Sequence, residues 1–375
     1  FPRERYPRVN GMKQRVFGTV AAFLAAVLLL TVPCSANSAR SAVVLDCVSG
    51  RLLLDKKGSE KSLIASTTKI MTALLVCERC NVLDQMVIPK QAVGIEGSSM
   101  YLKEGERLTL QELLYGLMLS SGNDAAVALA LYCCGSIQEF ANLMNDKARS
   151  LGMTGSHFEN PNGLDSPNHY STARDLAILA SYAMENPIFQ KTVSTKTVTV
   201  GNRVLRNHNK LLWLYPEADG VKTGYTKAAG RILVSSAVRD SRRLVAVTIH
   251  DPNDWADHAA MLNRGFENFR LRRIVTVGDC VGKLEIVGGD PAQVSVLAAE
   301  NFSYSVSNEE QPQLLLSGSG FLYAPAVEGS DADFAYVLLS GRAVGKIPVV
   351  YGQTSEIARQ EPEAKRPFLF WRKET

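Results

Sequence analysis

The pattern of apolar and polar positions divides the chain into four stretches. Residues 1–36 contain a continuous apolar run, residues 37–270 mix short apolar strands with amphipathic helices, and residues 271–354 show only short strands between turns. Residues 355–375 are polar apart from one short aromatic segment. Alternating apolar residues indicate strands, and apolar residues three or four apart indicate helices. We therefore predict a leader, an α/β layered domain, a small all-β domain and a polar tail.

In residues 37–270 strands lie at both ends and helices lie between them. A capping box at Thr109–Glu112 marks the start of one helix, and Asn186-Pro187 is expected to end the last central helix. The expected strands are 42–46, 52–55, 86–89, 192–200, 232–238 and 244–250. Expected helices begin after Lys69 and cover 109–119, 125–131, 137–151, 172–183 and 255–269. In residues 271–354 the expected strands are 275–280, 284–287, 294–298, 313–316, 334–339 and 347–350.

The first 36 residues have the layout of a secretory signal peptide. Basic residues at Met12–Arg15 precede the apolar run Val16–Val32, and the small residues Ser35-Ala36 follow it. Cleavage after Ala36 fits this layout, with residues 1–11 as an upstream extension. The alternative is an uncleaved membrane anchor, because the run is nearly long enough to span a bilayer. Either interpretation predicts an exported, extracytoplasmic protein.

Export changes the interpretation of the charge. The chain has 41 Lys and Arg against 37 Asp and Glu, and residues 1–36 hold five of the basic residues and one of the acidic ones. The remaining chain has 36 of each, so its net charge is close to zero. This balance gives no indication of a nucleic-acid partner.

Six cysteines remain beyond residue 36, and Cys77 and Cys80 form a C-x-x-C. Such a pair in isolation suggests redox chemistry or zinc. It continues an apolar helix, however, with no second C-x-x-C and no nearby histidine pair. We favour buried apolar thiols and predict no metal site and no cofactor; a disulfide stays open, since pairing does not follow from sequence.

Three short motifs carry the candidate chemistry. Ser66 and Lys69 are three residues apart at the start of an apolar helix, so their side chains share one face. A serine hydroxyl needs a base to become a nucleophile, and a lysine in a dry cleft can lose its charge and act as one. Ser121-Gly122-Asn123 lies in a turn between two expected helices, and Lys222-Thr223-Gly224 lies at a strand start. A cation, a hydroxyl and a glycine side by side suit a carboxylate beside an approaching backbone.

The order S-x-x-K, S-x-N, K-T-G is similar to that of penicillin-binding proteins and related β-lactamases. With its contexts at 65–74, 116–126, 160–164 and 219–226, the chain resembles the serine D-alanyl-D-alanine carboxypeptidases, the low-molecular-weight penicillin-binding proteins. The resemblance covers nearly all of the chain beyond residue 36. It implies an antiparallel sheet with helices on its faces and a small all-β C-terminal domain. The implied substrate is a peptidoglycan stem peptide, and the implied covalent inhibitors are β-lactam antibiotics.

The resemblance also implies a role for each motif residue. Ser66 would be the acylated nucleophile, Lys69 its base and Ser121 the proton relay to the leaving amine. Asn123 would hold the substrate amide. Lys222 and Thr223 would bind the terminal carboxylate, Gly224 would leave room for the peptide, and the N–H groups of Ser66 and Tyr225 would form the oxyanion hole.

Two departures and three alternatives accompany this interpretation. His208 stands between Asn207 and Asn209, where the family often has Arg or Thr, so it either lines the site or lies on the surface. The aromatic segment of the tail is short for the amphipathic membrane helix that often ends this family, so contact with the membrane or wall through the tail or the β domain stays open. The alternatives are a β-lactamase, an endopeptidase using the same site and a non-catalytic wall-binding protein.

Overall fold

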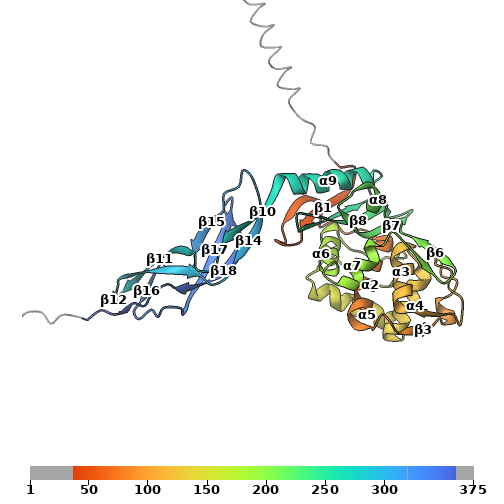
Figure 1. Cartoon of the computed structure of the whole chain (residues 1–375), viewed down its shortest axis with the longest axis horizontal. Coiled ribbons are helices and arrows are strands. Elements are labelled where there is room, and N and C mark those ends of the chain that lie inside the picture. The colour runs from red at the N-terminus through yellow and green to blue at the C-terminus, as the bar shows by residue number, and fades with distance from the viewer. Residues whose placement is uncertain (1–36, 319, 360–375) are drawn as a thin grey trace, which may run out of the picture.

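The computed structural model describes residues 37–318 and 320–359. The predicted signal peptide and residues 360–375 of the predicted tail lie outside the described residues. The described chain forms a larger part with helices and a sheet, and an elongated part built from strands (Figure 1).

The larger part is organised around a five-stranded antiparallel sheet with the order β2-β1-β9-β8-β7. The first two strands come from the start of the described chain and the other three from residues 218–249. The apolar pattern predicts β1, β2, β8 and β9, whereas β7 begins at Ala218, four residues before Lys222, where the sequence places a strand start. Val43 of β1 pairs with Val247 of β9, which in turn pairs with Val234 of β8. The strands are β1 (Ser41–Asp46), β2 (Leu52–Lys56), β7 (Ala218–Thr226), β8 (Gly230–Arg239) and β9 (Arg242–Ile249).

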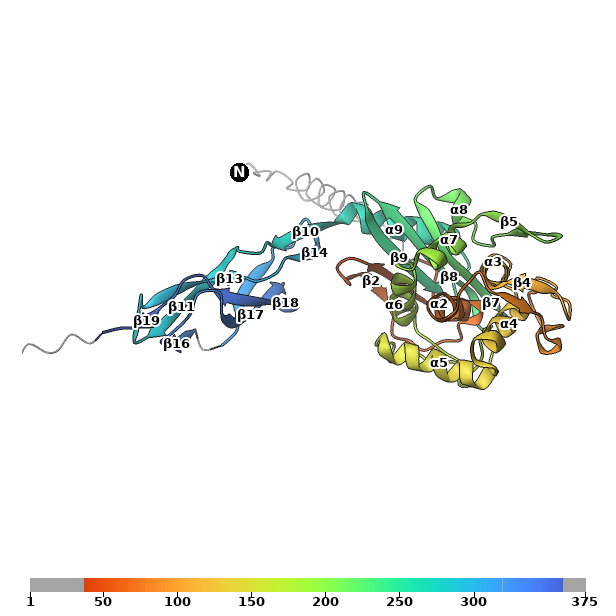
Figure 2. The same ribbon diagram turned by 60° about the horizontal axis from the view of Figure 1, so that its bottom comes forward.

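Helices cover both faces of this sheet, so its strands are apolar on both sides (Figure 2). Ala42 and Val44 of β1 pack in a cluster with Met261 and Leu262 of α9, while Val43 and Leu45 belong to the larger core on the opposite face. The helices are α2 (Lys69–Arg79), α3 (Leu110–Leu119), α4 (Asn123–Cys134), α5 (Ile137–Ser150), α6 (Ala173–Ala183), α7 (Pro187–Ser194), α8 (Leu211–Leu214) and α9 (Asp254–Asn268).

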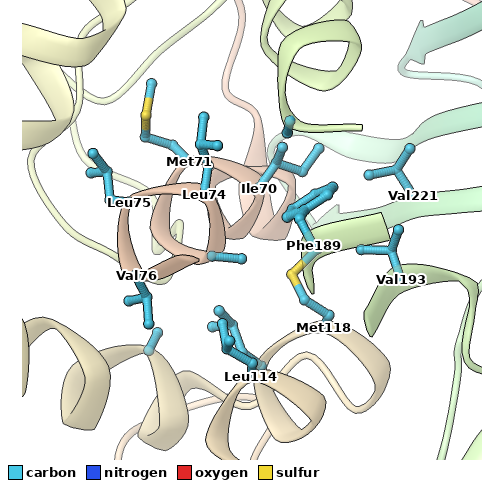
Figure 3. Close-up of a cluster of buried hydrophobic side chains, with 14 of the residues drawn as sticks. Ile70, Met71, Leu74, Leu75, Val76, Leu114, Met118, Phe189, Val193 and Val221 are labelled. Carbon is cyan, nitrogen blue, oxygen red and sulfur yellow. The ribbon is translucent and has the colours of Figure 1, made fainter. Parts of the chain in front are cut away.

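The helix that follows the S-x-x-K motif is the centre of the larger core. Every residue of α2 from Lys69 to Cys77 is buried. Figure 3 shows Ile70 and Leu74 among side chains from α3, α7 and β7, including Met118, Phe189 and Val221. Burial of this kind stabilises a domain by about 1.5–3 kcal/mol for each large side chain. The motif therefore lies on a rigid element.

Most of the predicted elements are confirmed, but the segment after Asn186 is not. The sequence predicts that Asn186-Pro187 ends a helix and that a strand starts at residue 192. Instead Asn186 caps a new helix, α7, by accepting hydrogen bonds from the backbone N–H groups of Ile188 and Phe189. Proline suits the first position of a helix because its missing N–H has no partner there in any helix. The hairpin that follows is shorter than predicted and joins β5 (Thr197–Val200) to β6 (Arg203–Arg206).

Small elements complete the larger part. The Thr109 capping box is present as predicted, with Glu112 N–H donating to the Thr109 side chain and Thr109 N–H donating to the Glu112 carboxylate.

Among the described residues no single helix is long and apolar enough to cross a membrane, although the bent pair α4 and α5 together is long and apolar enough by length and composition. The remaining elements are η1 (Ala65–Thr68), β3 (Gln85–Val87), η2 (Lys90–Ala92) and β4 (Arg107–Thr109).

The C-terminal part is an all-β domain, as predicted, and its largest sheet has the order β15-β17-β18-β13-β11-β16. The strand expected at 275–280 is wrong, because β10 ends at Val275 and a turn with Gly278 at φ +88° leads into β11. Val277, which suggests a continuing strand in the sequence, lies exposed in this turn. The strands are β10 (Phe269–Val275), β11 (Cys280–Val287), β12 (Gly289–Asp290), β13 (Gln293–Ala298), β14 (Phe302–Ser307), β15 (Gln313–Leu316), β16 (Phe321–Tyr323), β17 (Asp331–Leu339), β18 (Arg342–Tyr351) and β19 (Glu356–Ile357).

Buried polar contacts join the two parts. Arg242 of β9 donates to Asp46 of β1 (2.5 Å) and to the hydroxyl of Ser305 in β14 (3.0 Å). Ser305 Oγ also donates to the Asp46 carboxylate (2.7 Å), and all three residues are buried. Hydrogen bonds to charged groups hold such a junction more firmly than neutral ones.

Candidate active site

Ser66 lies in the single turn η1, directly before α2. The preceding residue, Ala65, has φ +46°, an unusual conformation for a residue with a side chain. Thr67 Oγ1 donates to the carbonyl of Ile64 at 2.6 Å, which closes the turn. Gly163 packs directly on this turn, because a Cβ added there would lie 1.9 Å from the Ala65 carbonyl oxygen. The turn is thus held from both sides, and the Ser66 side chain is only partly buried.

Lys69 begins α2 and is completely buried, with its Nζ surrounded by three oxygens. Ser66 Oγ lies 2.8 Å away, the side-chain oxygen of Asn123 2.7 Å and the backbone carbonyl of Asn162 2.6 Å. The structure therefore brings together Ser66 and Lys69, as the spacing predicts, and adds Asn123 from the S-x-N motif. Asn162 belongs to the turn 160–164, and its contact with Lys69 is not predicted from the sequence.

Burial is the main cause that lowers the pKa of Lys69 well below its ordinary value. The positive charge of Lys222 acts in the same direction, and the carboxylate of Asp124 opposes it. A charged ammonium without a paired carboxylate is expensive in a dry site, so the neutral amine is favoured.

Asn123 is held in one orientation by its neighbours. Its amide Nδ2 donates to the carbonyl of Glu96 (2.6 Å), so its Oδ1 must face Lys69. The next residue, Asp124, accepts hydrogen bonds from Ser99 Oγ and from the backbone N–H groups of Met100 and Leu102. The loop 96–102 is thereby fixed against the start of α4. Nothing in the sequence indicates these loop contacts, because the loop and the motif are far apart along the chain.

Ser121 occupies the turn between α3 and α4, as predicted. Its φ is +59° and only 4% of the residue is exposed. Gly122 N–H donates to the carbonyl of Gly116 (3.0 Å), which closes the turn behind Ser121. Ser121 and Ser66 line the same cleft.

The K-T-G motif lies on β7, the edge strand of the sheet. Lys222 is 1% exposed, its Nζ donates to the carbonyl of Thr223 (2.9 Å), and burial lowers its pKa to about 7. Thr223, Gly224 and Tyr225 line the cleft, and Tyr225 is 65% exposed. The sequence predicts a glycine at position 224 to leave room for the peptide, and the structure adds a packing reason. A Cβ at Gly224 would lie 3.2 Å from the carbonyl oxygen of Ile64, beside the Ser66 turn.

The cleft between these motifs has a volume of ≈ 1340 Å³, large for a dipeptide. Ser66, Ser121 and Thr223 of the three motifs line it. Further lining residues, with Trp213 and Trp255 among them, come from α8, the end of β6 and the start of α9, and this second group is called the outer part of the cleft below. His208 also lines the cleft, which answers the question that the sequence left open. Burial and the nearby charge of Lys222 lower the pKa of His208.

A second histidine, His169, contacts the turn that carries Ser66. The backbone N–H of Glu159 donates to Nδ1 of His169 (3.1 Å), so Nε2 carries the proton and donates to Thr68 Oγ1 (2.8 Å). Burial lowers the pKa of His169 to about 4. Sequence reasoning assigns no role to His169, because its partner lies 101 positions away.

The cysteines of the C-x-x-C lie in and beside the core, Cys77 buried and Cys80 partly buried. Within residues 37–318 and 320–359, no group of three or more His, Cys, Asp and Glu could hold a metal ion. The six cysteines of the same residues are all free thiols. Burial raises the pKa of Cys77 to about 12, which makes its thiol unreactive and agrees with the favoured interpretation of an apolar side chain.

Comparison with known proteins gives one family. Residues 30–253 match the family model described as D-alanyl-D-alanine carboxypeptidase, peptidase family S11. The chain belongs to this family. It is 30% identical to D-alanyl-D-alanine carboxypeptidase DacF of Bacillus subtilis, over 91% of this chain and 90% of the relative. It is also 30% identical to DacC of Escherichia coli, over 87% and 86%.

Solved structures agree with this membership. Penicillin binding protein 5 from Haemophilus influenzae superimposes with a TM-score of 0.75 at 27% identity, covering 87% of this chain and 99% of that one. The predicted class of enzyme, a serine-type D-alanyl-D-alanine carboxypeptidase, is therefore confirmed, and so is the predicted fold. The non-catalytic alternative loses its support.

Proposed function

We propose that Ser66 is the nucleophile of this carboxypeptidase and that Lys69 is its general base. The observation that carries the proposal is the contact between a completely buried Lys69 Nζ and Ser66 Oγ at 2.8 Å. The reaction is removal of the terminal D-alanine from a peptidoglycan stem peptide through an acyl-Ser66 intermediate.

The three oxygens around Lys69 support the role of base. A neutral amine has two N–H groups and one lone pair. The carbonyl oxygens of Asn123 and Asn162 can only accept, so the two N–H groups point to them. The lone pair then faces Ser66 Oγ, the one neighbour that has a proton to give. The site thus prepares the amine in the orientation that the first step needs.

Acylation then proceeds with a balanced proton path. Ser66 Oγ attacks the carbonyl carbon of the penultimate residue while its proton passes to Lys69 Nζ. The backbone N–H groups of Ser66 and Tyr225 are proposed to stabilise the oxyanion. When the C–N bond breaks, the proton reaches the leaving amine through the hydroxyl of Ser121. Water later cleaves the ester and regenerates Ser66. A β-lactam follows the same first step, but its leaving amine stays tethered in the opened ring.

The substrate is held on both sides of the scissile bond. Lys222 and Thr223 are proposed to bind the terminal carboxylate, since Lys222 is the buried cation beside Lys69 and Thr223 opens onto the cleft. Asn123 is proposed to hold the substrate amide, and Gly224 leaves room for the peptide along β7.

The location and domain limits complete the proposal. The signal peptide in residues 1–36 directs the protein to the outer face of the cytoplasmic membrane or the wall. Residues 37–270 form the catalytic domain and residues 271–354 the β domain. Through the β domain or the tail 355–375, the protein contacts the wall or the membrane surface.

The test is release of D-alanine from diacetyl-L-Lys-D-Ala-D-Ala by the wild type and by Ser66→Ala. The wild type should release D-alanine and become labelled by fluorescent penicillin, and the variant should do neither while keeping its thermal unfolding temperature. D-alanine release by Ser66→Ala would refute the assignment of the nucleophile.

A further inference from the structure

The outer part of the active-site cleft carries cations that the reaction does not use. Arg206 and Lys210 are exposed and line the cleft on one wall, formed by the end of β6 and the start of α8. Neither forms an ion pair with a carboxylate of the described residues. By contrast, Arg203 in the same strand pairs with Glu106, and Arg231, which also lines the cleft, pairs with Asp254. The positive charges of Arg206 and Lys210 are therefore available to a bound ligand.

Two buried asparagines hold this wall in place, and they alternate along the sequence with exposed polar residues. Asn207 and Asn209 are buried; Asn207 donates to the carbonyls of Val193 and Thr195, and Asn209 donates to the carbonyl of Gly220 in β7. The residues between and beside them are exposed to the cleft: Arg206, His208 and Lys210. The buried amides thus fix a row of polar side chains beside the K-T-G strand. Fixed groups bind a ligand at a lower entropic cost than mobile ones.

The indole ring of Trp213 lies in the same wall, and two positively charged side chains lie near it. Trp213 of α8 is 40% exposed and lines the cleft. The Arg206 guanidinium lies 5.2 Å from the centre of its ring and Lys196 Nζ lies 5.9 Å from it. Two cations thus lie near one ring, and neither forms an ion pair with a carboxylate of the described residues. Like charges held together repel, and an anion bound among them relieves that repulsion.

The type of reaction limits which part of the substrate can reach this wall. A carboxypeptidase removes one residue, so beyond the terminal carboxylate no further substrate exists on the leaving side. Any group that occupies the outer cleft must belong to the acyl donor, the part that stays on Ser66. This step rests on the proposed function.

We propose that Arg206 and Lys210, beside the Trp213 platform, bind a free carboxylate on the acyl-donor part of the stem peptide. The enzyme therefore selects donors that carry an acidic side chain or branch over donors in which that carboxylate is amidated. His208 lies in the same row, between the buried Asn207 and Asn209.

The experiment compares peptides that differ only in this charge. L-Lys-D-Ala-D-Ala is prepared with succinyl on one amine and acetyl on the other, and again with the neutral succinamoyl group in place of succinyl; both amines are tested in turn. For the wild type at low salt, kcat/KM should be about five- to tenfold higher for the succinyl peptide of at least one pair. The preference should shrink in about 0.5 M salt, because exposed charges are screened at that ionic strength.

Two variants separate this wall from a general charge effect. In Arg206→Gln/Lys210→Gln the succinyl-to-succinamoyl ratio should fall to about one. Arg107→Gln removes an exposed charge outside the cleft lining and should keep the wild-type ratio. A wild-type ratio of one for both pairs, or a preference that persists in the double variant, overturns the inference. If the wild type cleaves every peptide equally, only this inference fails; if it cleaves none, the proposed function fails with it.

Discussion

Gly163→Ala tests how closely the turn that carries Ser66, the proposed nucleophile, is held in place. The new Cβ would lie 1.9 Å from the carbonyl oxygen of Ala65 and 2.9 Å from Thr68 Oγ1, in a backbone with φ +85°. Ala65 precedes Ser66, so relief of this overlap has to move the turn that carries the proposed nucleophile. The first obstacle is backbone and not a flexible side chain, so a small rotation cannot remove it.

The expected cost has three parts. The left-handed backbone costs a residue with a side chain about 1–2 kcal/mol. Overpacking adds about 1–3 kcal/mol, and the lower entropy of the unfolded chain returns about 0.4–1 kcal/mol. The free energy of unfolding should thus fall by roughly 2–4 kcal/mol. Acylation should fall further, by about a hundredfold, because displacement of a reacting atom by about 1 Å has an effect of that size.

Gly152→Ala is the matched control. Gly152 has φ +72°, but a Cβ there meets nothing within 4 Å, so it isolates the backbone term of about 1 kcal/mol. Urea unfolding gives the two stability changes, and the rate of labelling by fluorescent penicillin gives acylation. If Gly163→Ala loses no more stability than Gly152→Ala, or is acylated at the wild-type rate, the described packing against Ala65 is wrong.

Three other predictions follow from the site. Lys69→Arg should lose acylation nearly as completely as Lys69→Ala, because guanidinium keeps its proton in proteins; a penicillin-labelling rate near wild type would reduce Lys69 to an electrostatic partner. A peptide ending in D-Ala-D-Ala amide should have a much lower kcat/KM than the free acid, and Thr223→Val should narrow the gap by weakening the acid; equal wild-type values would indicate an endopeptidase. Burial holds the pKa of His169 at about 4 against 6.5, so the folded state resists its protonation. The free energy of unfolding should fall by up to about 3 kcal/mol from about pH 6.5 to about pH 4, and His169→Gln should lack that component in urea titrations; an unchanged acid profile would count against it.

Local patterns predicted much of this molecule. The i, i+3 spacing of Ser66 and Lys69 was enough to place both side chains together, although Ser66 lies in a separate turn and not in the helix. Short apolar runs located strands β1, β2, β8 and β9 of the main sheet, and the Thr109 capping box located a helix start. These features depend on neighbours within a few residues, which a sequence displays directly.

Features that depend on distant neighbours were not predictable in the same way. The Asn162 carbonyl reaches Lys69 from 93 positions away, and His169 reaches Thr68 from 101. Backbone carbonyls carry no sequence signal, so only the fold reveals them. The missed helix α7 is different, because its signal was present: Asn186 as N-cap and Pro187 at the first position suit a helix start as well as a helix end.

The most direct test of the central claim is to find which atom penicillin acylates. The protein is incubated with benzylpenicillin, quenched with acid, digested and mapped by mass spectrometry, in parallel with Ser66→Ala and Ser121→Ala. We predict one adduct per chain on the peptide containing Ser66, no adduct in Ser66→Ala, and a slower adduct at the same serine in Ser121→Ala. An adduct on Ser121, or one that persists in Ser66→Ala, would contradict the assignment of Ser66 as the nucleophile activated by Lys69.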